Sequence, residues 1–144
     1  MDPIRQIETL IAILLASFDI QIQSIQFLGR HQMRSMLIHH TKTLIEALLR
    51  SIENIERQFV EEVENEAEQV LEQSATLAKA IAEAKDEMPE LKMLQELAQI
   101  AKSSHRSLTS SLAEGEKEVT DELVGRFTNM KNNIKSLLVR VDAL

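Results

Sequence analysis

The chain has 144 residues, the size of one ordinary domain, and a net charge of −7 at neutral pH. That charge argues against nucleic acid and anionic lipid as main ligands, because both are bound by neutralising phosphates with Lys and Arg. The absence of cysteine excludes disulfides, thiolate metal ligands and cysteine nucleophiles, and it fits a reducing compartment. We therefore expect an acidic cytoplasmic protein with no transmembrane segment, since the longest apolar run, residues 10 to 17, is too short to span a bilayer.

The composition favours long helices. Hydrophobic residues make up 44% of the chain, but there is no Trp or Tyr and there are only four Phe, so aliphatic side chains must fill the core. Only three Gly and two Pro are available for the turns that sheets and loop-rich enzymes need. The sequence therefore predicts an all-α fold.

The first helix is predicted for residues 3 to 28. Asp2 is a favourable N-cap residue, and proline suits the first helical position. Apolar residues then recur at spacings of three and four, and Gly29 provides a C-cap. Further apolar residues make almost the whole circumference apolar, which is typical of a helix with more than one neighbour: Leu10, Ile13, Leu15, Ile20 and Phe27.

Two much longer helices are predicted over residues 31 to 87 and 89 to 143, the second of them starting at Pro89, which can begin a helix but not continue one. Both carry apolar seams with coiled-coil-like spacing. The short breaks between helices force antiparallel neighbours, and folding about residue 88 places residue i of the second helix opposite roughly 176 minus i on the third. We expect a single helical domain, residues 1 to 144: an elongated antiparallel three-helix arrangement with the short first helix packed on a long helical hairpin.

The first helix is too short to cover the hairpin, which leaves residues 58 to 118 as a two-helix extension. Two helices alone cannot bury its apolar strip, and each large side chain left in water forgoes about 1.5 to 3 kcal/mol. We expect oligomerisation to complete a bundle, with a second copy in a homodimer or larger even oligomer as the economical partner. The predicted interface combines this strip with the outer side of the first helix: Leu10, Ile13, Ile20, Phe59, Val63, Val70, Leu77, Leu94, Leu108 and Leu112.

Two adjacent histidines, His39 and His40, are the most conspicuous chemical candidates. Neighbouring helical residues point about 100° apart, so this pair cannot hold one metal ion from the same face. The stretch HHTKTLIEAL resembles the histidine box of sensor-kinase dimerisation helices, and the resemblance implies that His39 is the phospho-acceptor of a histidine phosphotransfer dimer. Two positions depart from that pattern, because His40 replaces the acid that assists phosphotransfer and Leu44 replaces the proline. The other interpretation is structural, with one histidine at the core border and Asp19 near His40.

An acidic block between Glu53 and Glu72 carries eight glutamates against one arginine. Glutamates at i and i+4 repel each other by about 0.2 to 0.5 kcal/mol per pair. We expect the third helix to offset this repulsion with Lys102, His105 and neighbouring basic residues. The alternative is an acidic face for a basic partner protein.

Residues 101 to 118 form a weak part of the third helix. Five serines, Thr109 and Gly115 are poor helix formers. The sequence leaves three alternatives open for this segment: a hinge, a frayed region or a place where two backbones approach closely.

No catalytic constellation is present in the sequence: it has no Gly-rich phosphate loop, no nucleophile elbow and no Glu-x-x-His motif. We expect no enzyme activity, no cofactor and no bound metal, but a scaffold, adaptor or helical chaperone that binds itself or another helical protein. In its Tyr- and Trp-free composition and long Ala/Leu/Glu-rich helices the chain also resembles phasins. That resemblance implies an amphipathic coat on a hydrophobic granule or membrane surface.

Overall fold

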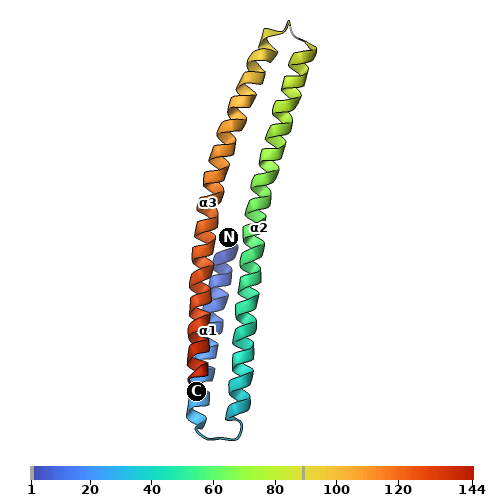
Figure 1. Ribbon diagram of the computed structural model, residues 1–144. Coiled ribbons are helices and arrows are strands. Elements are labelled where there is room, and N and C mark those ends of the chain that lie inside the picture. The colour runs from blue at the N-terminus through green and yellow to red at the C-terminus, as the bar shows by residue number, and fades with distance from the viewer. Residues whose placement is uncertain (1, 89) are drawn as a thin grey trace. The chain divides into compact units, whose positions relative to one another are not determined.

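The computed structural model describes residues 2 to 88 and 90 to 144, and within these ranges the chain forms three α-helices and no strand (Figure 1). The helices are α1 (Pro3–Leu28), α2 (Arg34–Glu87) and α3 (Lys92–Asp142). α2 and α3 form a helical hairpin, and α1 packs on it. The all-α class and the packing of a short first helix on a long hairpin are therefore confirmed. Completion of a bundle by oligomerisation stays a prediction.

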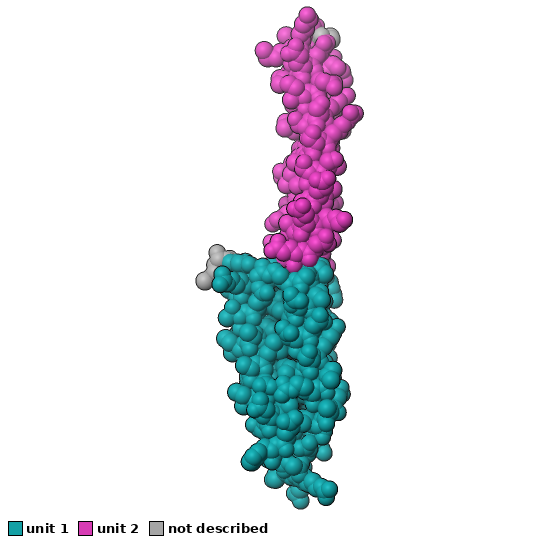
Figure 2. All heavy atoms as spheres, turned by 90° about the vertical axis from the view of Figure 1, so that its left-hand side faces the viewer, with its two compact units in different colours: residues 1–57, 124–144 teal, residues 58–123 magenta. Residues whose placement is uncertain are grey.

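The chain divides into two compact units, which Figure 2 shows in different colours. Unit 1 comprises Met1–Arg57 and Val124–Leu144, and unit 2 comprises Gln58–Leu123. Unit 1 therefore contains α1 with the first part of α2 and the last part of α3. Unit 2 contains the rest of the hairpin.

α1 has the bounds that the sequence predicts. The Asp2 side chain accepts a hydrogen bond of 3.0 Å from the backbone N–H of Ile4, and Pro3 occupies the first turn, where its missing N–H costs nothing. At the other end Gly29 has a φ of 60°, a conformation that side chains with a Cβ rarely adopt, and its N–H donates to the Gln26 carbonyl. Local capping chemistry therefore sets both ends of this helix.

The two long helices each begin three residues later than predicted. His31 lies outside α2 and caps the turn before it, because its Nδ1 accepts a hydrogen bond of 3.1 Å from the N–H of Met33. The predicted start of the third helix, Pro89, lies outside the described residues. The N–H of Leu91 donates to the carbonyl of Met88, which closes a turn before α3 begins, and α3 ends one residue before the predicted position 143.

Unit 1 has an apolar core to which all three helices contribute. The buried residues of α1 are separated by 7, 11 and 3 residues, which places them on one face of the helix, and α1 presents this face to the hairpin. α2 also contributes Thr41, which is fully buried and whose hydroxyl has no hydrogen-bond partner among the described residues. The buried apolar side chains are Ile4, Ile11, Ile22, Ile25, Ile45, Ile52, Phe127, Met130, Ile134, Leu137 and Val141.

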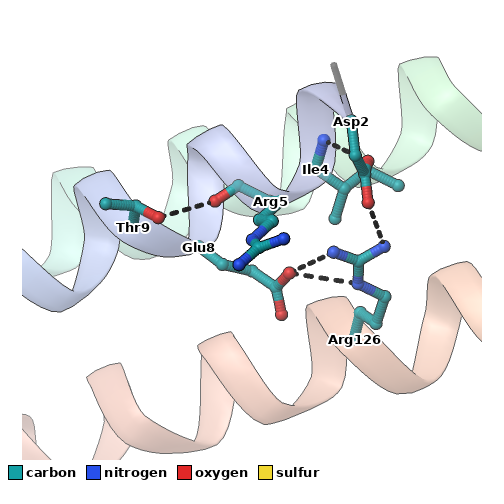
Figure 3. A network of polar contacts seen from close by, with 6 residues as sticks. All are labelled: Asp2, Ile4, Arg5, Glu8, Thr9 and Arg126. Carbon is teal, nitrogen blue, oxygen red and sulfur yellow. Dashed lines mark hydrogen bonds and ion pairs between the residues drawn. The ribbon is translucent and has the colours of Figure 1, made fainter.

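Ion pairs fix α1 to α3 at both ends of unit 1. Figure 3 shows the guanidinium of Arg126, on α3, between two carboxylates of the α1 end: it pairs with Asp2 at 2.9 Å and with Glu8. The hydrogen bond from Arg126 lowers the pKa of the Asp2 carboxyl below its ordinary value. Further along, Asp19 pairs with Arg140 of α3.

α2 is joined to α3 within unit 1 by two further ion pairs. Lys42 pairs with Asp142 at 2.9 Å, and Glu56 pairs with Lys131 at 2.7 Å. Arg34 also donates hydrogen bonds of 2.9 Å to the backbone carbonyls of Ile25 and Leu144, one to α1 and one to the end of the chain. The bond to Ile25 satisfies a carbonyl in the last turn of α1, where carbonyl groups lack intrahelical partners.

Unit 2 is a pair of helices with few buried side chains. Its buried apolar residues are Ala67, Ala98 and Leu123. The imidazole Nδ1 of His105 lies 3.0 Å from the hydroxyl of Ser74, which joins α3 to α2 by a hydrogen bond. Residues 101 to 118 are helical throughout, so the Ser-rich segment is not frayed in this structure.

Candidate interaction surfaces

The outer side of α1 is a largely apolar surface whose residues from Gln6 to Phe27 carry no charge, and Arg5 borders it at the N-terminal end. Leu10, Ile13 and Ile20 are 57%, 62% and 65% exposed, and Phe27 is 93% exposed. The two acidic side chains within α1, Glu8 and Asp19, do not belong to this surface, because both form ion pairs with α3. We call this surface the α1 outer face; its residues, all exposed, follow each other at alternating spacings of four and three: Gln6, Leu10, Ile13, Ser17, Ile20, Ser24 and Phe27.

The apolar character of α1 extends beyond its longest uninterrupted apolar run. Over 26 residues it contains an 18-residue window of mean hydropathy 1.5, which by length and composition alone is enough to cross a membrane. A core helix of a soluble protein passes the same test. Four isoleucines of α1 are buried in unit 1, and this gives the helix a protein environment on one side.

Unit 2 leaves many large apolar side chains in contact with solvent. Leu77 on α2 is 63% exposed, and Ile100 on α3 is 60% exposed. Two helices have only one mutual contact face, so side chains beyond it have no neighbour within the unit. The exposed large apolar residues of unit 2 are Val70, Leu77, Met88, Leu91, Met93, Leu97, Ile100 and Val119.

A groove between α2 and α3 interrupts the surface of unit 2. Its volume is about 290 Å³, and small residues on both helices open it. A Cβ placed on Gly115 would meet no atom within 4 Å, so the groove is open at this position. We call it the unit 2 groove; it is lined by Val63, Glu66, Ala67, Val70, Ser111, Leu112, Gly115, Glu116 and Val119.

The charges of the two units differ in sign. Residues 58 to 123 contain 16 acidic and 6 basic side chains, a net charge of −10, whereas the remaining residues contain 7 acidic and 10 basic side chains, a net charge of +3. In the described part of unit 2 the one ion pair is Lys79 with Glu83, at 4.0 Å and within a single helix. The charge match expected between the acidic block and α3 is therefore wrong within unit 2, since Lys102 makes no ion pair there and His105 bonds Ser74 instead.

The predicted interface residues fall into two groups. The α1 members are exposed on the α1 outer face, and Val70 and Leu77 are exposed on α2. The others are half-buried on α2 and α3: Phe59, Val63, Leu94, Leu108 and Leu112. The prediction missed the exposed Met93, which a search for apolar residues off the main seam would have found.

His39 and His40 are both exposed on α2. No hydrogen bond or ion pair joins either imidazole to another described residue; the backbone carbonyl of His39 accepts a bond from the Thr43 hydroxyl. The expected contact of Asp19 with His40 is wrong, because Asp19 pairs with Arg140 and accepts a hydrogen bond from Gln23. Across residues 2 to 88 and 90 to 144, no group of three or more His, Asp or Glu side chains could hold a metal ion.

No protein-family model matches this chain, and no curated protein or solved structure matches it either. Its function is therefore argued from its own surfaces.

Proposed function

We propose that the protein is a non-enzymatic helix-binding protein, a scaffold, adaptor or helical chaperone that associates with itself and with other helical proteins. The observation that carries the proposal is the exposure of unit 2. Among its described residues, unit 2 buries three apolar side chains and leaves eight large ones exposed, six of them on the two helices. Burial of one such side chain stabilises a complex by about 1.5 to 3 kcal/mol, so the packing of a helix from another chain on this surface is favourable.

The α1 outer face is the surface that best suits self-association. Its alternating spacing of four and three is that of a coiled-coil seam. In an antiparallel pair of α1 helices related by a two-fold axis, Ile13 faces Ile20 of the other copy and Leu10 faces its Ser24, so large side chains meet small or matching ones. The absence of charge on this face means that pairing buries no unpaired ion.

The mass of the protein in solution tests self-association. Light scattering on a sizing column should give a dimer or a larger even assembly at micromolar concentration, and Ile13→Glu should convert it to a helical monomer. Ile134→Ala is the matched comparison, because Ile134 is buried in the core and its change should lower stability without changing the mass of the folded protein. A monomer for the wild-type protein at all concentrations would contradict self-association and leave only foreign helices as partners.

A second candidate function is favoured by the length and hydropathy of α1. We propose, as the alternative, that the α1 outer face covers a hydrophobic granule or membrane surface, as the coat proteins that the chain resembles in composition do. Exposed Phe27, Ile20 and Ile13 are the residues that would enter such a surface. The absence of basic residues on this face makes neutral polymer or lipid the appropriate surface to test.

Co-flotation with neutral phosphatidylcholine vesicles and with polymer particles tests the coat function. Binding that Ile13→Glu and Ile20→Glu abolish would support it. A protein that stays in the bottom fraction, with unchanged helicity in the presence of either surface, would exclude the α1 outer face as a coat.

A further inference from the structure

We propose that the unit 2 groove receives a basic amphipathic helix of another protein. The inference rests on the proposed helix-binding function and adds the chemical character of the partner. A partner of this kind has an apolar stripe that enters the groove and Lys or Arg on both sides of the stripe.

The shape of the groove fits the apolar stripe of a helix. Val63 and Val70 on α2 and Leu112 and Val119 on α3 give it apolar walls. The floor of the groove has no side chain at Gly115, and a Cβ placed there would meet no atom within 4 Å. A glycine inside a helix costs about 1 kcal/mol relative to alanine, and the packing of this chain alone does not require it. The open position allows an incoming backbone to approach α3 closely.

The charge around the groove determines the sign of the partner. Glu66 on α2 and Glu116 on α3 line the groove themselves, one from each helix. Glu62, four residues before Glu66 on the same face of α2, adds a third carboxylate near the groove. The single ion pair of the described part of unit 2 lies elsewhere, at Lys79 and Glu83. Basic side chains on both flanks of a docked helix would face these carboxylates and relieve their mutual repulsion.

The same charge argues against a second copy of this chain as the occupant. Packing unit 2 against unit 2 brings two net charges of −10 together, and like charges across an interface are unfavourable. The α1 outer face of a second copy also fits poorly, since it carries no basic residue from Gln6 to Phe27. A basic helix from a different protein satisfies both the apolar and the acidic parts of the surface.

Two synthetic helical peptides test the inference on the full-length protein. Both are 18-residue amphipathic peptides with a leucine stripe; the polar face is lysine in one and glutamine in the other. Titration by fluorescence anisotropy should show the lysine peptide binding at least about tenfold more tightly than the glutamine peptide. The affinity for the lysine peptide should also fall as salt rises, and the double variant Glu66→Gln/Glu116→Gln should remove most of its advantage over the glutamine peptide.

A matched pair of glycine variants separates docking in the groove from diffuse attraction to an acidic protein. Gly115→Gln fills the groove and Gly125→Gln does not, although both replace an open glycine in α3 and leave the net charge unchanged. Both variants should fold, since glutamine is the better helix former. We expect Gly115→Gln to weaken binding of the lysine peptide about tenfold or more, and Gly125→Gln to leave it unchanged.

The other outcomes overturn the inference in distinguishable ways. Equal affinity for both peptides would mean that the groove binds helices without regard to charge, and the proposed function would survive. Equal binding of the lysine peptide to both glycine variants would place it outside the groove. A dimer that Gly115→Gln dissociates would make a second copy the occupant. A monomer that binds neither peptide would contradict the proposed function itself.

Discussion

Units 1 and 2 are built from the same two long helices but differ in what covers them. In unit 1, α1 supplies a third face, so eleven apolar side chains are buried and ion pairs join each helix to α3. In the described part of unit 2 no third helix is present, the buried apolar residues are two alanines and one leucine, and one ion pair, Lys79 with Glu83, is formed. The comparison indicates that unit 1 is stabilised by its own contacts, whereas unit 2 presents a surface suited to contacts with other chains.

The largest expected difference concerns Phe127, which is fully buried in unit 1. Phe127→Ala should lower the free energy of unfolding by about 3 to 5 kcal/mol, because it removes a large core side chain and leaves a cavity. Urea unfolding followed by circular dichroism measures the change.

Phe27→Ala is the matched comparison, since Phe27 is 93% exposed on α1. This variant should leave the unfolding of the monomer nearly unchanged, and any effect should fall on self-association or surface binding. A loss below about 1 kcal/mol for Phe127→Ala would contradict the core assignment of unit 1.

The second prediction concerns a polar group inside the core of unit 1. Thr41 is fully buried and its hydroxyl has no partner in the described part of the chain, so it is desolvated without compensation. Thr41→Val removes the hydroxyl and keeps the branched shape, and it should stabilise unit 1 by about 1 to 2 kcal/mol in urea unfolding. Thr43→Val is the control, because Thr43 is exposed and its hydroxyl donates a hydrogen bond to the carbonyl of His39. A loss of stability in Thr41→Val would show that the Thr41 hydroxyl has a hydrogen-bond partner in solution.

Local signals made the division into two units predictable. The N-cap at Asp2, the proline after it and Gly29 fix the length of α1, and that length determines how much of the hairpin it covers. The sequence therefore places the end of the three-helix part between residues 57 and 58 of α2, where the boundary of unit 1 lies. On α3 the predicted boundary, residue 118, falls five residues before the observed one.

Register and charge pairing were not predictable in the same way, because they depend on the turn between α2 and α3. Folding about residue 88 puts Ser74 opposite about residue 102, but Ser74 bonds His105. Ser74 lies 13 residues before the end of α2 (87 − 74), and His105 lies 13 residues after the start of α3 (105 − 92). The predicted register is therefore wrong by three residues, the same number by which α3 starts after the predicted position. The spacing of apolar residues in the seam does not reveal this later start.

Residues that follow the apolar repeat of unit 2 also differ in how far they are buried. A strict repeat of seven through Val63 and Val70 leads to Leu77, which is 63% exposed. Neighbouring residues of α2 are less exposed: Ala67 is buried, and Leu71 and Ser74 are half-buried. Small and polar residues at the contact line have a weak hydrophobic signal, so the periodicity favoured the larger side chains beside them.

The third prediction uses salt to separate the two units. Raising the salt concentration from about 0.05 M to about 0.5 M screens repulsion among surface glutamates and weakens exposed ion pairs. Unit 2 contains repelling pairs such as Glu62 with Glu66 and Glu64 with Glu68, each of about 0.2 to 0.5 kcal/mol, so its helices should gain about 1 kcal/mol in total. Amide hydrogen exchange resolved by segment should slow several-fold in residues 58 to 123 and stay constant or accelerate in unit 1. The same response in both units would contradict the idea that charge repulsion destabilises unit 2 and not unit 1.

The smallest expected effect is the response of unit 1 to acid at the Asp2–Arg126 contact. The hydrogen bond from Arg126, together with the one from the N–H of Ile4, lowers the pKa of Asp2 in the folded protein. A carboxyl with a lowered folded pKa contributes stability that is present above its unfolded pKa and lost as the pH falls through its folded pKa. The N-terminal end of α1 should therefore loosen from α3 only below the ordinary pKa of aspartate, and by a small amount because both side chains are partly exposed.

Titration of the Asp2 carboxyl by NMR in the wild type and in Arg126→Gln measures this contact directly. The variant removes the hydrogen bond from Arg126, which contributes most to the lowered pKa, but keeps the hydrogen bond from the N–H of Ile4. The pKa of Asp2 should therefore rise part of the way toward its ordinary value. Arg140→Gln is the control, since it breaks the pair with Asp19 at the other end of α1 and leaves Asp2 untouched. An unchanged midpoint in Arg126→Gln would mean that the ion pair does not form in solution, and apolar burial, including that of Ile4 and Ile11, would then hold this end of α1 in place.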